Sequence, residues 1–129
     1  MRLNDAMDEK LKNRYDFFRK LSKLPPEIAD KKELSGIKLF EDLSILDPWR
    51  NNFSALKYTN EKDGYVLAGK LDEVFVNDKE EYIPVDFKSS GDAPKEDKQK
   101  YYRLQLHGYA LMLSQLGYKP ANIAYLVHY

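Results

Sequence analysis

The chain contains no cysteine. Disulfide bonds, thiolate zinc sites and cysteine-ligated iron–sulfur clusters are therefore excluded within these 129 residues, and a metal ion must use oxygen ligands or the two histidines. No apolar run approaches the roughly 18 to 20 residues that cross a bilayer, and the first residues, MRLND, lack the apolar stretch of a secretory signal. The sequence therefore predicts a cytoplasmic protein with no membrane partner.

An excess of charge of either sign is also absent, because 21 Lys and Arg balance 21 Asp and Glu. A neutral chain is not expected to coat nucleic acid by bulk charge, although a local basic groove is compatible with neutrality. Hydrophobic residues make up 43% of the chain and aromatic residues 13%, which is enough for one core. We expect a single domain over residues 1–129, with its function in a local site.

Hydropathy patterns predict two amphipathic helices. From residue 3 to about residue 24, apolar side chains recur at intervals of three or four until Pro25-Pro26 ends the helix. A second helix is expected from about residue 96 to residue 116, where Gly117 ends it.

The strand signals lie between and after these helices. Residues 65–76 and 81–88 are rich in β-branched and aromatic side chains and flank a polar turn, so they predict a β-hairpin. Strands are also expected near residues 53–58 and 121–129, and Asp47-Pro48 predicts a turn before the first of them. The order α, β, β, β, α, β predicts an α/β (α+β) fold, a mixed sheet flanked by helices.

The hairpin predicts a pair of facing carboxylates. If its turn is centred on Lys79, residues whose numbers sum to about 158 face each other, which places Asp72 opposite Asp86. Like charges on facing residues are destabilising unless a cation compensates. Alternation places Lys88 on the face of Asp86, whereas a slip of one residue would send Asp72 to the other face. The remaining apolar positions, Leu71, Phe75, Ile83, Val85 and Phe87, are expected to point into the core.

The two aspartates point to metal-assisted chemistry. Completed by water and the backbone carbonyl of Phe87, they suit Mg²⁺ or Mn²⁺ better than zinc. On a phosphodiester, such an ion would polarise the phosphoryl oxygen and acidify a water molecule. Lys88 would then orient the nucleophile and stabilise the developing charge.

The second predicted helix adds polar groups to this set. Gln105 and Tyr109 are four residues apart and share a helix face, from which both could hydrogen-bond a water or a phosphate. Residues 95–103 interleave Lys and Arg with tyrosines and could track a nucleic-acid backbone. Because the same stretch contains Glu96 and Asp97, a solvated helix start explains it equally well.

Three ordered motifs resemble those of the PD-(D/E)XK nuclease superfamily, and in particular its RecB-type branch. Gly69-Lys70-Leu71-Asp72 looks like the family's G-x-x-D strand, Asp86-Phe87-Lys88-Ser89-Ser90 like its D-x-K strand, and Gln105-Leu106-His107-Gly108-Tyr109 like its Q-x-x-x-Y helix. The resemblance implies a restriction-endonuclease-like αβββαβ core and cleavage of DNA with Mg²⁺ or Mn²⁺.

The resemblance extends to the first predicted helix. Residues 3–8, LNDAMD, look like the family's first helix, which often contributes a His or an acidic residue to the site. Asp8 is the nearest candidate for a further metal ligand, and Asp5 is the alternative. By the same resemblance we expect a domain trimmed at both ends that acts within a larger nuclease, helicase or repair assembly.

Three interpretations stay open. The first is a metal-dependent DNA nuclease with Asp72, Asp86, Lys88, Gln105 and Tyr109 in its site. The second is a nuclease fold kept as a nucleic-acid-binding or scaffold module with little catalysis. The third is an accidental motif match, in which the aspartates belong to a solvated face. In each of them His107 and His128 are expected to be non-catalytic and Trp49 to lie in the core.

Overall fold

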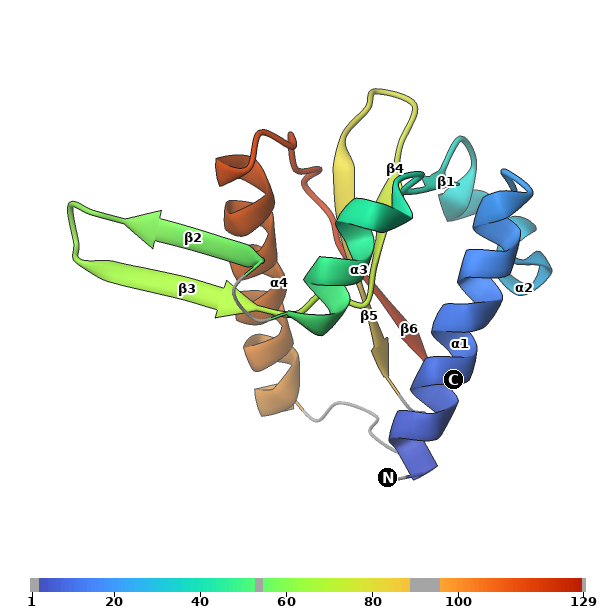
Figure 1. The fold of residues 1–129 in the computed structure, drawn as a ribbon, viewed down its shortest axis with the longest axis horizontal. Coiled ribbons are helices and arrows are strands. Elements are labelled where there is room, and N and C mark those ends of the chain that lie inside the picture. The colour runs from blue at the N-terminus through green and yellow to red at the C-terminus, as the bar shows by residue number, and fades with distance from the viewer. Residues whose placement is uncertain (1–2, 53–54, 89–95, 129) are drawn as a thin grey trace.

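A computed structural model of the chain describes residues 3–52, 55–88 and 96–128, with side chains for residues 6–52, 55–88 and 106–128 (Figure 1). The elements in chain order are α1 (Leu3–Lys20), α2 (Pro26–Ala29), the 3₁₀ helix η1 (Lys32–Leu34), β1 (Lys38–Leu39), α3 (Leu43–Asn51), β2 (Leu56–Asn60), β3 (Tyr65–Gly69), β4 (Glu73–Val76), β5 (Tyr82–Lys88), α4 (Glu96–Gln115) and β6 (Tyr125–His128). Both predicted long helices are confirmed, with the first ending before Pro25.

The centre of the molecule is a mixed sheet with strand order β1-β4-β5-β6. β4 pairs antiparallel with β1 and with β5, whereas β5 and β6 are parallel. A parallel pair needs a crossover connection, and α4 provides it. The α/β fold class predicted from the sequence is confirmed.

Helices cover both faces of this sheet (Figure 1). On the face of α1, Tyr15 packs in a cluster with Phe75, Ile83, Val85 and Phe87. On the face of α3 and α4, the cluster contains Val74 and Val76 from β4 together with Phe40, Leu46, Trp49, Leu56, Leu71, Tyr109, Met112 and Leu113. The prediction that Trp49 belongs to the core is confirmed. Within the described residues, no helix is both long enough and apolar enough to span a bilayer.

Two sequence-based expectations about residues 65–76 are wrong. The segment is not one strand, because the chain leaves β3 at Gly69 and enters β4 only at Glu73. The interruption shifts the alternation, so Leu71 packs on the α4 side with Val74 rather than with Phe75 on the α1 side. β3 instead pairs with β2 in a separate two-stranded sheet that projects from the body (Figure 1).

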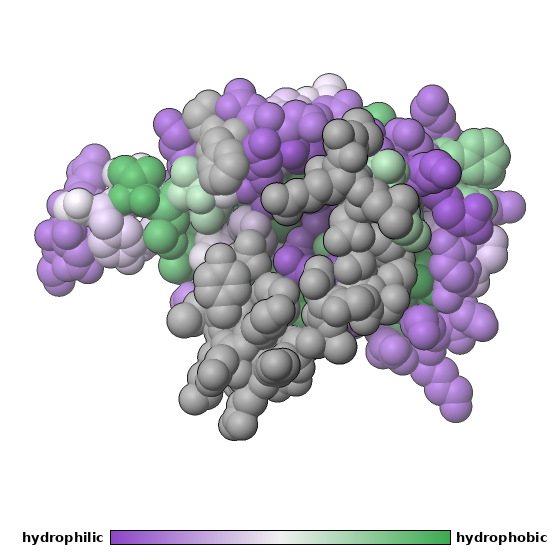
Figure 2. All heavy atoms as spheres, turned by 90° about the horizontal axis from the view of Figure 1, so that it is seen from below, coloured by the Kyte–Doolittle hydropathy of each residue, from purple (hydrophilic) through white to green (hydrophobic). Residues whose placement is uncertain are grey.

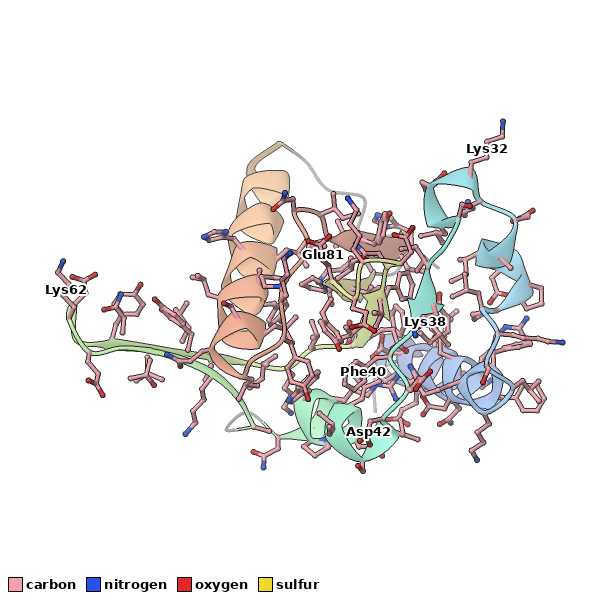
Figure 3. The ribbon with its side chains drawn as sticks, turned by 90° about the horizontal axis from the view of Figure 1, so that it is seen from above. Lys32, Lys38, Phe40, Asp42, Lys62 and Glu81 are labelled. Carbon is pink, nitrogen blue, oxygen red and sulfur yellow. The ribbon has the colours of Figure 1, made fainter. Side chains whose placement is uncertain are left out.

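The projecting hairpin is attached to the body through α4. The Gln115 side chain donates to the Thr59 carbonyl at 2.9 Å and accepts from the Thr59 amide at 2.7 Å. Lys62 lies at the far end of the hairpin (Figure 3). Hydrophobic surface is visible on the hairpin in Figure 2. Val66 of β3 is 59% exposed.

The predicted turn at Asp47-Pro48 is also wrong, because both residues lie inside α3. Asp42 caps this helix: it lies at the helix N-terminus (Figure 3) and its side chain accepts from the Ser44 amide at 3.0 Å. Pro48 removes one helical hydrogen bond, but its carbonyl still accepts from the Asn52 amide at 2.8 Å. Burial of the neighbouring Trp49 offsets the local preference for a turn.

A buried ion network ties α1, α3 and β4 together. The Glu73 carboxylate, 0% exposed, accepts from the Arg19 guanidinium through one oxygen and from Arg50 Nη2 at 3.0 Å through the other. Asp16 accepts from Arg19 at 2.7 Å and from Arg50 at 3.0 Å. Arg19 Nε donates to the Phe40 carbonyl at 2.6 Å, and Arg50 Nε donates to the Asp72 carbonyl at 2.7 Å.

This network balances its own charge, since two arginines face two carboxylates. Burial raises the pKa of Glu73 and the two guanidinium groups oppose that shift. Removing one member of such a network leaves an uncompensated charge in a dry environment, which is strongly destabilising.

We therefore predict that Glu73→Ala lowers the free energy of unfolding by about 3 to 5 kcal/mol in urea denaturation. Glu41→Ala is the matched control, because Glu41 is 83% exposed and 4.0 Å from Lys38, and it should cost less than about 0.5 kcal/mol. If Glu73→Ala does not fold, Glu73→Gln, which keeps the shape, should lose about 1 to 3 kcal/mol. Equal stability of the Glu73 and Glu41 variants would contradict the role of the network.

Candidate active site

The register of β4 and β5 brings the two predicted carboxylates together. Glu73 faces Val85 and Val76 faces Tyr82, so the residue numbers of each pair sum to 158, as the sequence predicted. One residue beyond the last pair, Asp72 lies opposite Asp86. The alternative in which a slip sends Asp72 to the opposite face is therefore wrong.

Asp72 is held by contacts from two directions. Its Oδ2 accepts from the Phe87 amide at 2.8 Å, and its Oδ1 lies 3.5 Å from Lys12 Nζ. Burial, together with a hydrogen bond to Asp86 and the charge of Asp86, raises the pKa of Asp72 to about 7 against the opposing effects of Phe87 and Lys12. A partly buried carboxyl group, that of Asp72, and a buried one, that of Asp86, therefore lie close together.

Lys88 completes the predicted set on β5. Its Nζ lies 2.9 Å from Oδ2 of Asp86. Because residues 86 and 88 are two apart on one strand, their side chains share a face. The structure therefore brings Asp72, Asp86 and Lys88 together where β4 begins and β5 ends.

The backbone of Phe87 borders the same site. In an antiparallel ladder the N–H and C=O of one residue point to the same neighbouring strand. Since the Phe87 amide reaches Asp72, its carbonyl also points to the β4 side, beyond the last ladder pair at Glu73 and Val85. Two carboxylates and one carbonyl are oxygen donors of the kind that Mg²⁺ and Mn²⁺ prefer.

A third acidic ligand is not in place among the described side chains. Over residues 6–52, 55–88 and 106–128, no three His, Cys, Asp or Glu side chains are grouped so that they could hold a metal ion. Asp8 lies against Lys12, with its Oδ2 3.0 Å from Nζ, and Lys12 stands between it and Asp72. The Asp5 side chain lies outside the described residues. The metal-ligand role of Asp8 stays a prediction.

Tyr109 lies in the core on the α4 side and is 6% exposed. Its ring is packed so closely on β3 that a Cβ at Gly69 would lie 3.0 Å from Tyr109 Cε1. The glycine of the G-x-x-D motif is thus explained by close packing of the helix on the strand. Gln105 lies one turn earlier in α4, and its side chain is outside the described residues, as are those of residues 95–103. The site roles of Gln105 and Tyr109 remain predictions.

The two histidines lie on α4 and at the end of β6, where His128 is the register partner of Lys88. His107 is exposed on α4, where it borders a hollow between this helix and the segment before β6. His128 is exposed at the end of β6.

Sequence reasoning missed two residues that contact Asp72. Lys12 follows Asp8 by four residues, a spacing that predicts an ion pair on one helix face, but the sequence does not indicate that this face meets Asp72. Arg50 donates to the Asp72 carbonyl at 2.7 Å, a contact across 22 residues for which the sequence carries no signal.

Comparison with protein-family models shows which family the chain belongs to. The family model of the PD-(D/E)XK nuclease superfamily matches residues 5–128. The chain belongs to the PD-(D/E)XK nuclease superfamily. No curated protein and no solved structure matches it significantly. Members of the PD-(D/E)XK superfamily are generally nucleases, so membership suggests nuclease activity for this chain.

The raised pKa of Asp72 predicts a pH-dependent stability in EDTA. The folded value, about 7, exceeds the ordinary value of 3.8, so the contribution of Asp72 is present at low pH and is lost as the pH rises through 7. Asp72→Asn removes this ionisation. We compare the free energy of unfolding of Asp72→Asn with that of the wild type by urea denaturation at each pH. The difference, variant minus wild type, should be about 1 to 3 kcal/mol more positive at pH 8 than at pH 5.

Asp78→Asn is the control, because Asp78 is an exposed residue in the turn of the same hairpin. Its stability relative to wild type should not change between the two pH values. If the difference in free energy of unfolding between Asp72→Asn and wild type is the same at pH 5 and pH 8, the crowding of the Asp72 and Asp86 carboxyl groups is contradicted.

Proposed function

We propose that the protein is a Mg²⁺- or Mn²⁺-dependent nuclease of RecB type that hydrolyses phosphodiester bonds of DNA. The observation that carries the proposal is the Asp72–Asp86 pair, with Lys88 Nζ 2.9 Å from Asp86, in a chain of a nuclease superfamily. A buried pair of like charges is destabilising unless it is compensated, and a divalent cation compensates it directly.

The residues present fit such an ion. Asp72 and Asp86 would hold it through carboxylate oxygens, the Phe87 carbonyl would add a neutral oxygen, and water would fill the other positions, as is usual for Mg²⁺. Asp8 is a further candidate ligand from α1. When bound, the ion supplies Lewis-acid polarisation of the phosphoryl oxygen and lowers the pKa of water.

The chain's own groups would perform the remaining tasks. The Lys88 ammonium would orient the attacking water and stabilise the charge that develops on the phosphoryl oxygens. The Phe87 amide, which donates to Asp72 Oδ2 at 2.8 Å, holds that carboxylate oxygen in place, and Oδ1 would be the oxygen that holds a cation. Gln105 and Tyr109 would orient water or a backbone phosphate from α4.

We also propose that the enzyme works in the cytoplasm, within a larger nuclease, helicase or repair assembly. The main rival is a nuclease fold that binds nucleic acid with little catalysis. The absence of a third grouped acidic ligand among the described side chains favours that rival, whereas the complete Asp, Asp, Lys set favours catalysis.

Labelled single- and double-stranded DNA, incubated with Mg²⁺, Mn²⁺ or EDTA, tests the proposal. We expect cleavage with either metal, none in EDTA, and a loss of at least about a hundredfold in rate for Asp86→Ala and Lys88→Ala. Asp78→Asn, in the turn of the same hairpin, should cleave like the wild type. Binding of Mn²⁺ and DNA without cleavage would support the binding module instead. A folded protein that does not bind Mn²⁺ would overturn the proposal.

A further inference from the structure

Lys12 is a second ammonium group at the carboxylate pair, contributed by the first helix. Its Nζ lies 3.0 Å from Asp8 Oδ2 and 3.5 Å from Asp72 Oδ1, and its side chain is 17% exposed. Lys12 therefore bridges an acid of its own helix and an acid of the proposed metal site.

The helix that carries Lys12 is fixed against the sheet. One turn further along α1, Tyr15 is fully buried and its ring packs edge-on against Phe87 at 5.1 Å. One turn beyond, Arg19 enters the buried network with Glu73. Because α1 is held at these two points, Lys12 can change partners only by rotation of its own side chain.

The charges around the site favour an anionic substrate only after a cation binds. Asp8, Asp72 and Asp86 provide three carboxylates, and Lys12 and Lys88 provide two ammonium groups. Burial lowers the pKa of Lys12, but the hydrogen bond to Asp8 and the charges of Asp72 and Asp8 outweigh it, so Lys12 stays charged. A divalent cation would reverse the sign of this set from negative to positive.

A cation on Asp72 would also change the position of Lys12. The cation would neutralise the Asp72 carboxylate, which now attracts Lys12 Nζ. It would also repel the Lys12 ammonium group at short range. The Asp8 contact, which is the shorter of the two, does not depend on Asp72. Lys12 would therefore remain anchored on its own helix at the edge of the site with donors available to a new acceptor.

We propose that Lys12 is a phosphate-binding residue of this site, which neutralises Asp72 in the metal-free protein and contacts a DNA phosphate once a divalent cation occupies the aspartates. This inference rests on the proposed nuclease function and adds a substrate contact from α1. The rival explanation is a purely structural ion pair between α1 and the strand.

The two explanations differ in their effect on metal and on DNA. Loss of a structural pair would loosen α1 and leave the salt dependence of DNA binding unchanged. With one phosphate contact fewer, about one counterion fewer is released on binding. The plot of log affinity against log salt concentration would then be less steep by about 0.9 for duplex DNA. Because Lys12 competes with the cation for Asp72, its removal should also strengthen metal binding.

The experiment uses Lys88→Ala as the background, so that DNA is not consumed, and adds Lys12→Gln, Lys12→Arg or Lys10→Gln. Lys10 is exposed two residues away and points from a different side of α1, so Lys10→Gln is the matched control. Fluorescence anisotropy measures affinity for duplex DNA over a range of salt concentrations with Mn²⁺, and calorimetry measures Mn²⁺ affinity without DNA.

With Mn²⁺, Lys12→Gln should weaken DNA binding about five- to tenfold and lower the salt slope by about one. It should tighten Mn²⁺ binding by up to about fivefold, within the range of partly exposed ion pairs. Lys12→Arg should restore DNA affinity, and Lys10→Gln should change neither quantity.

An unchanged salt slope, or weaker Mn²⁺ binding in Lys12→Gln, would overturn the role of Lys12. If the wild type nevertheless cuts DNA with Mn²⁺, the nuclease function stands and only this inference fails. If the wild type and every variant bind Mn²⁺ but none of them, the wild type included, binds or cuts DNA, both the nuclease function and the Lys12 contact fail.

Discussion

The buried carboxylate of Glu73 is the constraint on which the rest of the site depends. Its two oxygens accept from Arg19 on α1 and Arg50 on α3, and Asp16 completes the balance of charge. Because an unpaired charge in this position would be strongly destabilising, both helices must dock on β4 in one orientation. Arg50 also donates to the carbonyl of Asp72 at 2.7 Å, so the network fixes the backbone that carries the site.

Two neighbouring acidic residues where β4 begins, Asp72 and Glu73, have opposite roles because their surroundings differ. Glu73 points to the helices, where two guanidinium groups satisfy it. Asp72, one residue earlier, meets a second carboxyl group, and burial with the proximity of Asp86 raises its pKa to about 7. The Phe87 amide and the Lys12 ammonium only partly oppose this shift. The chain thus satisfies one acid internally and leaves the other suited to an external cation.

Local patterns predicted those parts of the structure that depend on local geometry. The hairpin register followed from strand alternation and the position of the turn, and it placed Asp72 opposite Asp86. The helices followed from apolar spacing. The break between β3 and β4, the helical position of Pro48, and the contacts of Arg50 and Lys12 depend on packing between segments far apart in the chain. Polar residues on an amphipathic helix normally face solvent, so nothing in α1 distinguishes Arg19 and Lys12, which the fold buries or half-buries, from exposed Lys10.

The central claim is that Asp72 and Asp86 form one divalent-cation site. Crystals grown with Mn²⁺ and measured near the manganese absorption edge test it directly, because anomalous scattering locates the ion independently of activity. A single site for the ion predicts a peak within direct coordination distance of a carboxylate oxygen of each aspartate, and loss of that peak in Asp86→Ala. A fully occupied manganese ion elsewhere on the chain, with no peak between the two aspartates, would contradict it.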